Sequence, residues 1–179
     1  MVYVALLRGI NVGGKAMVSM TALKSCFEDL GFEDVTTYIN SGNVLFKTDR
    51  VGNGTMTKEI EAALQETFKL NVKVLLKTEP QLKELLSKVP AKWVNDVTTK
   101  CDVMFLWPEI DKPDVIEQLT VNPDVEELRY EPGALLWCLE RANYTKSRVP
   151  RMIGTPLYAQ MTIRNINTLR KLVALADKL

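Results

Sequence analysis

The chain has 179 residues, 46% of them hydrophobic and 25% charged, and its 23 basic and 22 acidic residues leave a net charge of +1. This composition is typical of a soluble globular protein and excludes a disordered or fibrous chain, while the length suits one domain or two small halves that share a core. No apolar run approaches the ~18 residues of a membrane span, and the opening residues lack the features of a signal peptide, so we expect no membrane association and a cytoplasmic location.

Residues 1–90 have the pattern of a first folded half. Apolar residues recur at helical spacing in several stretches, Asn40 to Asn43 form a good hairpin turn, and Thr78 with Gln81 has the spacing of a capping box. The predicted elements are a strand over Val2–Leu7, a helix over 20–30 capped by Ser19, strands over 35–39 and 44–46, a helix over 56–68, a strand over 72–76 and a helix that Pro90 ends.

Residues 91–179 repeat this order. The predicted elements are a strand over 103–107, a helix opened by Asp111 and Pro113, a hairpin of strands over 125–130 and 134–139, and a last helix over about 167–176. The repeated order of strand, helix, hairpin and helix is that of the split β-α-β unit. The sequence therefore predicts an α+β fold with two ferredoxin-like halves in one compact chain.

The residues that are missing limit the chemistry. The chain has no histidine, which is the usual general base near neutral pH and the commonest metal ligand. Catalytic triads that use histidine and zinc sites that contain histidine are therefore excluded within this chain. We expect no metal site, and no motif in the sequence indicates a particular cofactor. The three cysteines, Cys26, Cys101 and Cys138, are far apart, and an odd number in a cytoplasmic chain predicts reduced, buried thiols.

Charge is concentrated at the two ends of the chain. Residues 1–27 contain three basic residues and no acidic one, and residues 141–176 contain seven and none. Residues 28–140 carry 12 basic against 21 acidic residues, a net charge of −9. If the ends converge, they form a positive face that suits an anionic ligand. The alternative is that these are solvated cations on separate surfaces.

Gly9 to Lys15 fits the phosphate-binding pattern G-x-x-x-x-G-K and follows a predicted strand. However, Ala16 stands where a serine or threonine would bind Mg²⁺, and the helix is expected to begin later, near Ser19. These departures argue against a nucleotide triphosphatase. An anion-binding loop before a helix N-terminus and a purely structural turn stay open.

Two polar segments stand out in the second half. Residues 143–151 form a basic connector that either orders over a phosphate or a nucleic-acid backbone or is a solvated loop. Residues 161–168 place several polar side chains at a helix start. Asn165 is expected to cap that helix. The positive charge of Arg164 interacts unfavourably with the helix dipole at this end, unless the side chain pairs with a bound anion or a carboxylate.

Specific motifs are spread from end to end of the sequence: Leu7 to Lys15, Tyr38-Ile39, Ser41 to Val44, Lys146-Ser147, Thr162, Arg164-Asn165, Thr168 and Lys171-Leu172. Through these motifs the whole chain resembles an uncharacterised bacterial family, domain of unknown function 1697 (DUF1697). This family's pattern usually continues with asparagine after the lysine of the first loop, where this chain has Ala16. The resemblance implies an α+β fold of two ferredoxin-like halves and brings no established activity, cofactor or substrate.

Our leading hypothesis is a small-molecule site where the loop after the first strand meets the C-terminal Arg-Asn-Thr segment. Arginines and lysines would bind a phosphate or carboxylate, and amides and hydroxyls would orient the ligand. Binding alone and catalysis stay open, because no spaced pair of acids presents itself. The candidate ligand-binding residues are Arg8, Asn11, Gly13, Gly14, Lys15, Ser41, Asn43, Lys146, Thr162, Arg164, Asn165, Thr168 and Lys171.

Two other functions stay open, and so does the oligomeric state. Ferredoxin-like sheets bind nucleic acids when exposed aromatic residues stack on bases, but Phe46, Phe105 and Trp107 alternate poorly with basic residues and are predicted to belong to the core. The third possibility is a protein-interaction module that docks a partner through the acidic middle of the chain.

Overall fold

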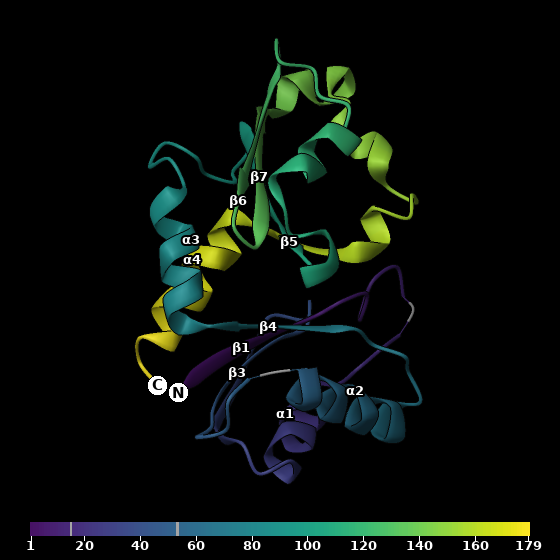
Figure 1. The fold of residues 1–179 in the computed structure, drawn as a ribbon, viewed down its shortest axis with the longest axis vertical. Helices are drawn as coiled ribbons and strands as arrows, with labels where there is room; N and C mark the ends of the chain where they lie inside the picture. Colours follow the sequence, from purple (N-terminus) through teal and green to yellow (C-terminus); the bar gives the residue numbers. More distant parts are fainter. Residues whose placement is uncertain (15, 53) are drawn as a thin grey trace. The chain divides into compact units, whose positions relative to one another are not determined.

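The structure is a computed structural model that describes residues 1–14, 16–52 and 54–179. The chain divides into two compact units: the first unit, Met1–Leu82 with Leu172–Leu179, and the second unit, Lys83–Lys171. Figure 1 shows the elements in sequence colours. Within the described ranges, no helix is long and apolar enough to cross a membrane. The predicted domain division at residues 1–90 and 91–179 stays a prediction.

The first unit has the predicted order of a ferredoxin-like half. Its four strands form one antiparallel sheet in the order β2-β3-β1-β4, as expected for a split β-α-β unit. The elements are β1 (Val2–Leu7), α1 (Met20–Asp29), β2 (Glu33–Tyr38), β3 (Asn43–Lys47), α2 (Gly54–Phe68) and β4 (Val74–Thr78).

Helices α1 and α2 pack on one face of this sheet (Figure 1). The predicted apolar stripes are buried there, with Phe27 of α1 and Ile60 of α2 both fully covered. Alternation along the strands places Tyr3 and Phe46 on the same face, where their rings stack. The helical spacing in the sequence therefore predicted correctly which residues form this core.

The second unit arranges its strands in the same order, β6-β7-β5-β8. Its strands are β5 (Thr99–Leu106), β6 (Glu126–Glu131), β7 (Ala134–Glu140) and β8 (Met161–Asn165). Two α-helices contain the boundaries between the units, α3 (Glu79–Lys88) and α4 (Ile166–Ala176). The capping box predicted for α3 is present: the Thr78 N–H donates to Gln81 Oε1 (2.9 Å), and the Gln81 N–H donates to Thr78 Oγ1 (3.4 Å). The fold is thus α+β, with two ferredoxin-like halves.

The helix expected at Asp111 and Pro113 does not form, and short 3₁₀ helices cover this unit instead. Lys112, not Asp111, stands at the N-cap of η2, and Asp111 Oδ1 accepts hydrogen bonds from Tyr130 Oη (3.0 Å) and from the Gly133 N–H (2.8 Å) instead. Prolines start or interrupt several of these segments. The 3₁₀ helices are η1 (Pro108–Ile110), η2 (Pro113–Gln118), η3 (Arg141–Lys146), η4 (Val149–Met152) and η5 (Tyr158–Gln160).

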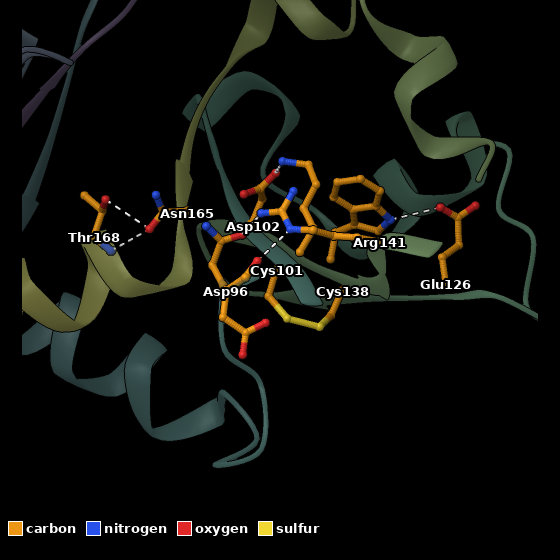
Figure 2. Close-up of polar contacts among 11 residues, drawn as sticks. Asp96, Cys101, Asp102, Glu126, Cys138, Arg141, Asn165 and Thr168 are labelled. Atoms are coloured by element: carbon orange, nitrogen blue, oxygen red, sulfur yellow. Dashed lines mark hydrogen bonds and ion pairs between the residues drawn. A yellow bond between two sulfur atoms is a disulfide. The ribbon is translucent and has the colours of Figure 1, made fainter. Parts of the chain in front are cut away.

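The cysteine prediction was wrong for two of the three residues. Cys101 of β5 and Cys138 of β7 are directly opposite in the strand register, with Cα atoms 4.1 Å apart, and form a disulfide (Figure 2). They are separated by 37 residues in sequence, so only the strand pairing brings them together. Cys26 is a free, buried thiol, and burial raises its pKa.

Candidate functional site

The loop after β1 contains several residues with left-handed backbone conformations. Gly9, Gly13 and Gly14 have φ values of 76°, 58° and 74°, and Asn11 has 54°. Lys15 lies outside the described residues. Helix α1 begins at Met20, after the Ser19 cap, so the predicted late start of the helix is confirmed. The glycine-rich loop therefore does not lead directly into a helix as the phosphate-binding motif does.

Asn11 holds this loop together from within. Its Nδ2 donates to the carbonyl oxygens of Val18 (3.0 Å) and Asn40 (2.9 Å), and its Oδ1 accepts the Val18 N–H (2.7 Å). Both amide hydrogens and the amide oxygen are thus engaged in the protein. Asn11, predicted to orient a ligand, shapes the loop and joins it to the hairpin turn between β2 and β3.

That hairpin turn packs against the end of β1. The side chain of Asn43 is fully buried, and its Nδ2 donates to the Tyr38 carbonyl and to Ser41 Oγ, both at 3.0 Å. Gly42 has a φ of 75°, and a Cβ at this position would lie 2.8 Å from Leu7 Cβ, so only glycine fits. The loop and the turn thus bring Asn11 to the turn that contains Ser41 and Asn43, whereas the backbone N–H of Arg8 donates to the Lys73 carbonyl (2.9 Å).

Arg164 is the most unusual predicted residue in the second unit. It lies on β8 opposite Val103 and is only 7% exposed. Its Nη1 donates to Thr162 Oγ1 (3.0 Å) and to the Ile163 carbonyl (2.8 Å). Desolvation lowers the pKa of the guanidinium to about 10. A cation in this low-dielectric setting attracts an anion more strongly than a solvated one does.

Strand alternation puts Arg164 and Thr162 on the sheet face opposite the apolar core of the 3₁₀ helices. Asp102 lies on the neighbouring strand β5, one residue before Val103, the residue opposite Arg164. Because side chains alternate along a strand, Asp102 projects to the opposite face of the sheet from Arg164. Its carboxylate pairs there with Lys100 Nζ at 2.7 Å (Figure 2). Arg164 and Thr162 thus form a polar pair within a buried, otherwise apolar surface.

The predicted cap at the start of α4 is confirmed. Asn165 Oδ1 accepts hydrogen bonds from the Thr168 N–H (2.9 Å) and from Thr168 Oγ1 (3.2 Å) (Figure 2). This places Asn165 at the N-cap and occupies the Thr168 hydroxyl proton. Lys171, one turn further along the helix, is exposed.

Two arginines of the basic C-terminal region have structural roles that the sequence did not reveal. Arg141 Nε donates to the Asp96 carbonyl (2.7 Å) (Figure 2), and Arg170 Nη2 donates to the Trp93 carbonyl (2.6 Å). Asn167 Nδ2 also donates to the Asn95 carbonyl (2.7 Å). These side chains hold the segment before β5, so their charges are not simply solvated.

Glu126 is a buried centre of hydrogen bonding that sequence reasoning missed. Its carboxylate accepts hydrogen bonds from Trp137 Nε1 (3.0 Å) (Figure 2) and from Ser147 Oγ. It also accepts the backbone N–H groups of Asn122 (2.8 Å), Arg148 (2.9 Å) and Val149 (3.4 Å). Burial acts to raise the pKa of Glu126, but these hydrogen bonds outweigh it, so the pKa is below its usual value. Four of the five donors lie 11 to 23 residues from Glu126 in the sequence, so they left no local signal.

Lys146 precedes Ser147 and is exposed in η3. Ser147 is tied to Glu126 on β6, whereas Arg164 lies on β8, the opposite edge of the same sheet. The structure thus brings Thr162 next to Arg164 and Asn165 next to Thr168, but it does not bring Lys146 to them. The predicted residues fall into separate groups in the two units, and their convergence on one ligand stays a prediction.

A solved structure, described as conserved bacterial protein SP0830 from Streptococcus pneumoniae, is similar to this chain over its whole length. The TM-score is 0.83 with 28% sequence identity, and the alignment covers 98% of each chain. No curated protein matches the sequence. The model of the family described as "Protein of unknown function (DUF1697)" matches residues 1–136. Because this match spans most of the sequence, the chain belongs to the DUF1697 family.

Proposed function

We propose that this protein binds a small ligand carrying a phosphate or a carboxylate group, with Arg164 as the principal contact. The observation that supports the proposal is the buried Arg164 guanidinium, which lies beside the Thr162 hydroxyl. Desolvation lowers the pKa of this guanidinium to about 10. A bound anion would add a favourable charge interaction to this desolvated guanidinium. Arginine suits the role because its planar fork binds two oxygens of a carboxylate or phosphate at once.

The neighbouring predicted residues have secondary roles in this proposal. The Thr162 hydroxyl fixes the guanidinium, and the Asn165 cap sets the start of α4. Lys171 adds positive charge to the same helix. In the first unit, the loop after β1 contributes Arg8, Lys15 and the backbone of Gly13 and Gly14, while Asn11, Ser41 and Asn43 maintain its shape.

A thermal-shift screen tests the proposal. Wild-type protein is heated with inorganic phosphate, sugar phosphates, nucleotides and short carboxylic acids. A ligand at 100 times its Kd stabilises the folded protein by about 2.7 kcal/mol, which appears as a rise in Tm. We expect this rise to disappear in Arg164→Met, which keeps the volume of the side chain, and to shrink in Arg164→Lys. Arg129→Met is the matched control, because Arg129 is an exposed arginine of the same sheet.

The proposal fails if no anion raises the Tm of the wild type, or if Arg164→Met responds as the wild type does. Arg8→Met then tests the loop. If Arg8 and Arg164 contact one ligand, each single variant loses the response and the double variant loses little more. If only Arg164 contacts the ligand, Arg8→Met keeps the full response.

The alternative of nucleic-acid binding has less support. Phe46 and Phe105, which would have to stack on bases, are fully buried, as the sequence predicted. Including a short RNA and a short DNA in the same screen tests this alternative. A stabilisation by either that falls steeply with added salt and persists in Arg164→Met would favour it over the small-ligand proposal.

A further inference from the structure

A hollow of about 420 Å³ lies within the second unit, and no residue of β8 is among the residues given for its lining. It is lined by residues from the end of η2, from η4 and from the turn before η5. Its apolar wall includes Leu119, Met152 and Leu157, and its polar wall includes Arg148, Arg151 and Thr155. We refer to it as the arginine pocket. Its volume falls in the range of about 300–1,000 Å³ that is typical of small-molecule sites.

The charge of the arginine pocket is uncompensated. Arg148 and Arg151 are both exposed, and no acidic residue is among the lining residues that the structure describes. Neither guanidinium makes a hydrogen bond or an ion pair with any described residue. Glu126 accepts the backbone N–H of Arg148, but its carboxylate is buried among five donors and does not line the pocket. Two unpaired cations in one concave surface produce a positive potential that favours an anion.

The segment that carries both arginines is held in place from beneath. Glu126 fixes Ser147 and the N–H groups of Arg148 and Val149. The Arg151 N–H donates to the Arg148 carbonyl (3.0 Å), which sets the spacing of the two side chains. Thr155, also on the polar wall, donates its Oγ1 hydrogen to the Met152 carbonyl (2.6 Å). The backbone that carries the two arginines is therefore pre-organised, which reduces the entropy lost when a ligand binds.

We propose that the arginine pocket binds a small organic anion whose carboxylate or phosphate is held by Arg148 and Arg151. The apolar part of this ligand would contact Leu119, Met152 and Leu157, since these residues form the remaining wall. An inorganic ion would make only the charged contacts and should bind more weakly. The site is separate from the ligand contact proposed for Arg164, which lies on β8, and it gives a role to the basic connector that the sequence analysis left open.

Isothermal titration calorimetry with four defined probes tests the proposal: phenyl phosphate, benzoate, inorganic phosphate and benzyl alcohol. We expect phenyl phosphate or benzoate to bind the wild type more tightly than inorganic phosphate and benzyl alcohol do. The stronger of the two tells whether the natural anionic group is a phosphate or a carboxylate. Arg148→Ala and Arg151→Ala should each weaken this binding about tenfold, the effect of one lost charge-assisted contact.

Lys112→Ala is the matched control, because it removes one exposed cation of the same unit that pairs with Asp114. The proposal is overturned if Lys112→Ala weakens binding as much as the arginine variants do, or if the arginine variants bind normally. Equal binding of inorganic phosphate and phenyl phosphate would contradict the role of the apolar wall. Arg164→Met separates the two proposals: it should remove the response assigned to Arg164 and leave binding in the arginine pocket unchanged.

Discussion

The two units place their strands in the same order but cover their sheets by different means. In the first unit, α1 and α2 each bury an apolar stripe on one face of the sheet. In the second unit, the corresponding connections are 3₁₀ helices of three to six residues. Segments this short cannot present a long apolar stripe or a continuous hydrogen-bonded helix.

The second unit also has an apolar core, and three further contacts join its strands and connections. These are the Cys101–Cys138 disulfide between adjacent strands, the buried carboxylate of Glu126, and Asp111, which binds the β6–β7 hairpin. The comparison shows that one strand order occurs with two kinds of covering, long α-helices in the first unit and short 3₁₀ helices in the second. It also gives a practical probe, because Trp93, Trp107 and Trp137 all lie in the second unit and their fluorescence reports on it alone.

The largest effect is expected from Phe27→Ala in the first unit. Phe27 is fully buried between α1 and the sheet, and removing its ring should destabilise the protein by about 3–5 kcal/mol. The measurement is urea unfolding followed by far-UV circular dichroism, which is dominated by the α-helices. Leu30→Ala is a matched control at a half-buried position of the same region and should have a smaller effect. Equal losses would show that α1 does not contribute its stripe to the core as described.

Loss of the disulfide should have a slightly smaller effect, confined to the second unit. In the chain-entropy picture, a bridge between residues 37 apart contributes about 4 kcal/mol. We expect Cys101→Ala/Cys138→Ala to shift the unfolding midpoint seen by tryptophan fluorescence to lower urea. The control is Cys26→Ala, which removes the free buried thiol of the first unit without breaking a crosslink. An unchanged fluorescence midpoint in the double variant would show that the 3₁₀ segments need no crosslink.

Glu126→Gln is expected to destabilise the second unit by about 1–3 kcal/mol at neutral pH, because an amide directs N–H donors at groups that are themselves donors. The pKa of Glu126 is lowered in the folded protein, so its contribution is present above the unfolded pKa of about 4.3 and is lost as pH falls through the folded value. Fluorescence-monitored unfolding between pH 7 and pH 3 measures this loss, and Glu126→Gln should remove it.

The neighbouring Glu127 provides the control for this pH experiment. Its carboxylate is half-exposed and pairs with Arg129, an arrangement that contributes about 0–1 kcal/mol. Glu127→Gln should therefore keep nearly all the stability and most of the acid sensitivity of the wild type. If Glu127→Gln and Glu126→Gln behave alike, the buried carboxylate is not what anchors the basic connector.

How much of the structure could be predicted depended on whether the signal was local. The stripes of α1 and α2, the Thr78–Gln81 capping box and the Asn165 cap involve residues three or four apart and were predicted correctly. The disulfide and the Glu126 centre join residues 37 and up to 23 positions apart, so no local pattern could show them. Strand β8 was missed because Thr162 and Arg164, polar residues, occupy buried strand positions.

The candidate site shows the same division. The sequence identified Asn11, Asn43 and Arg164 as unusual polar residues, but it could not separate a structural role from a ligand contact. Asn11 and Asn43 bind the backbone of their own loop and turn. Arg164 is different because its burial lowers its pKa, a property that depends on the apolar neighbours supplied by β5. That environment became visible only once β8 was recognised as a strand.

The smallest loss of stability is expected from removing the N-cap side chains of α4 and α1. Asn165 Oδ1 lies 2.9 Å from the Thr168 N–H, whereas Ser19 Oγ lies 3.4 Å from the Ala22 N–H in an exposed position. We therefore expect Asn165→Ala to destabilise the protein by about 1 kcal/mol and Ser19→Ala by about half of that, measured by thermal unfolding.

Asn165→Asp then separates capping from ligand contact, since aspartate is an equally good cap. If Asn165 only caps α4, this variant should keep both the stability and the response to the anionic ligand proposed for Arg164. If its amide also contacts that ligand, the stability is kept but the response weakens, because a carboxylate repels an anion. A loss of stability in Asn165→Asp equal to that in Asn165→Ala would contradict the capping role itself, and with it the assignment of Asn165 to the start of α4.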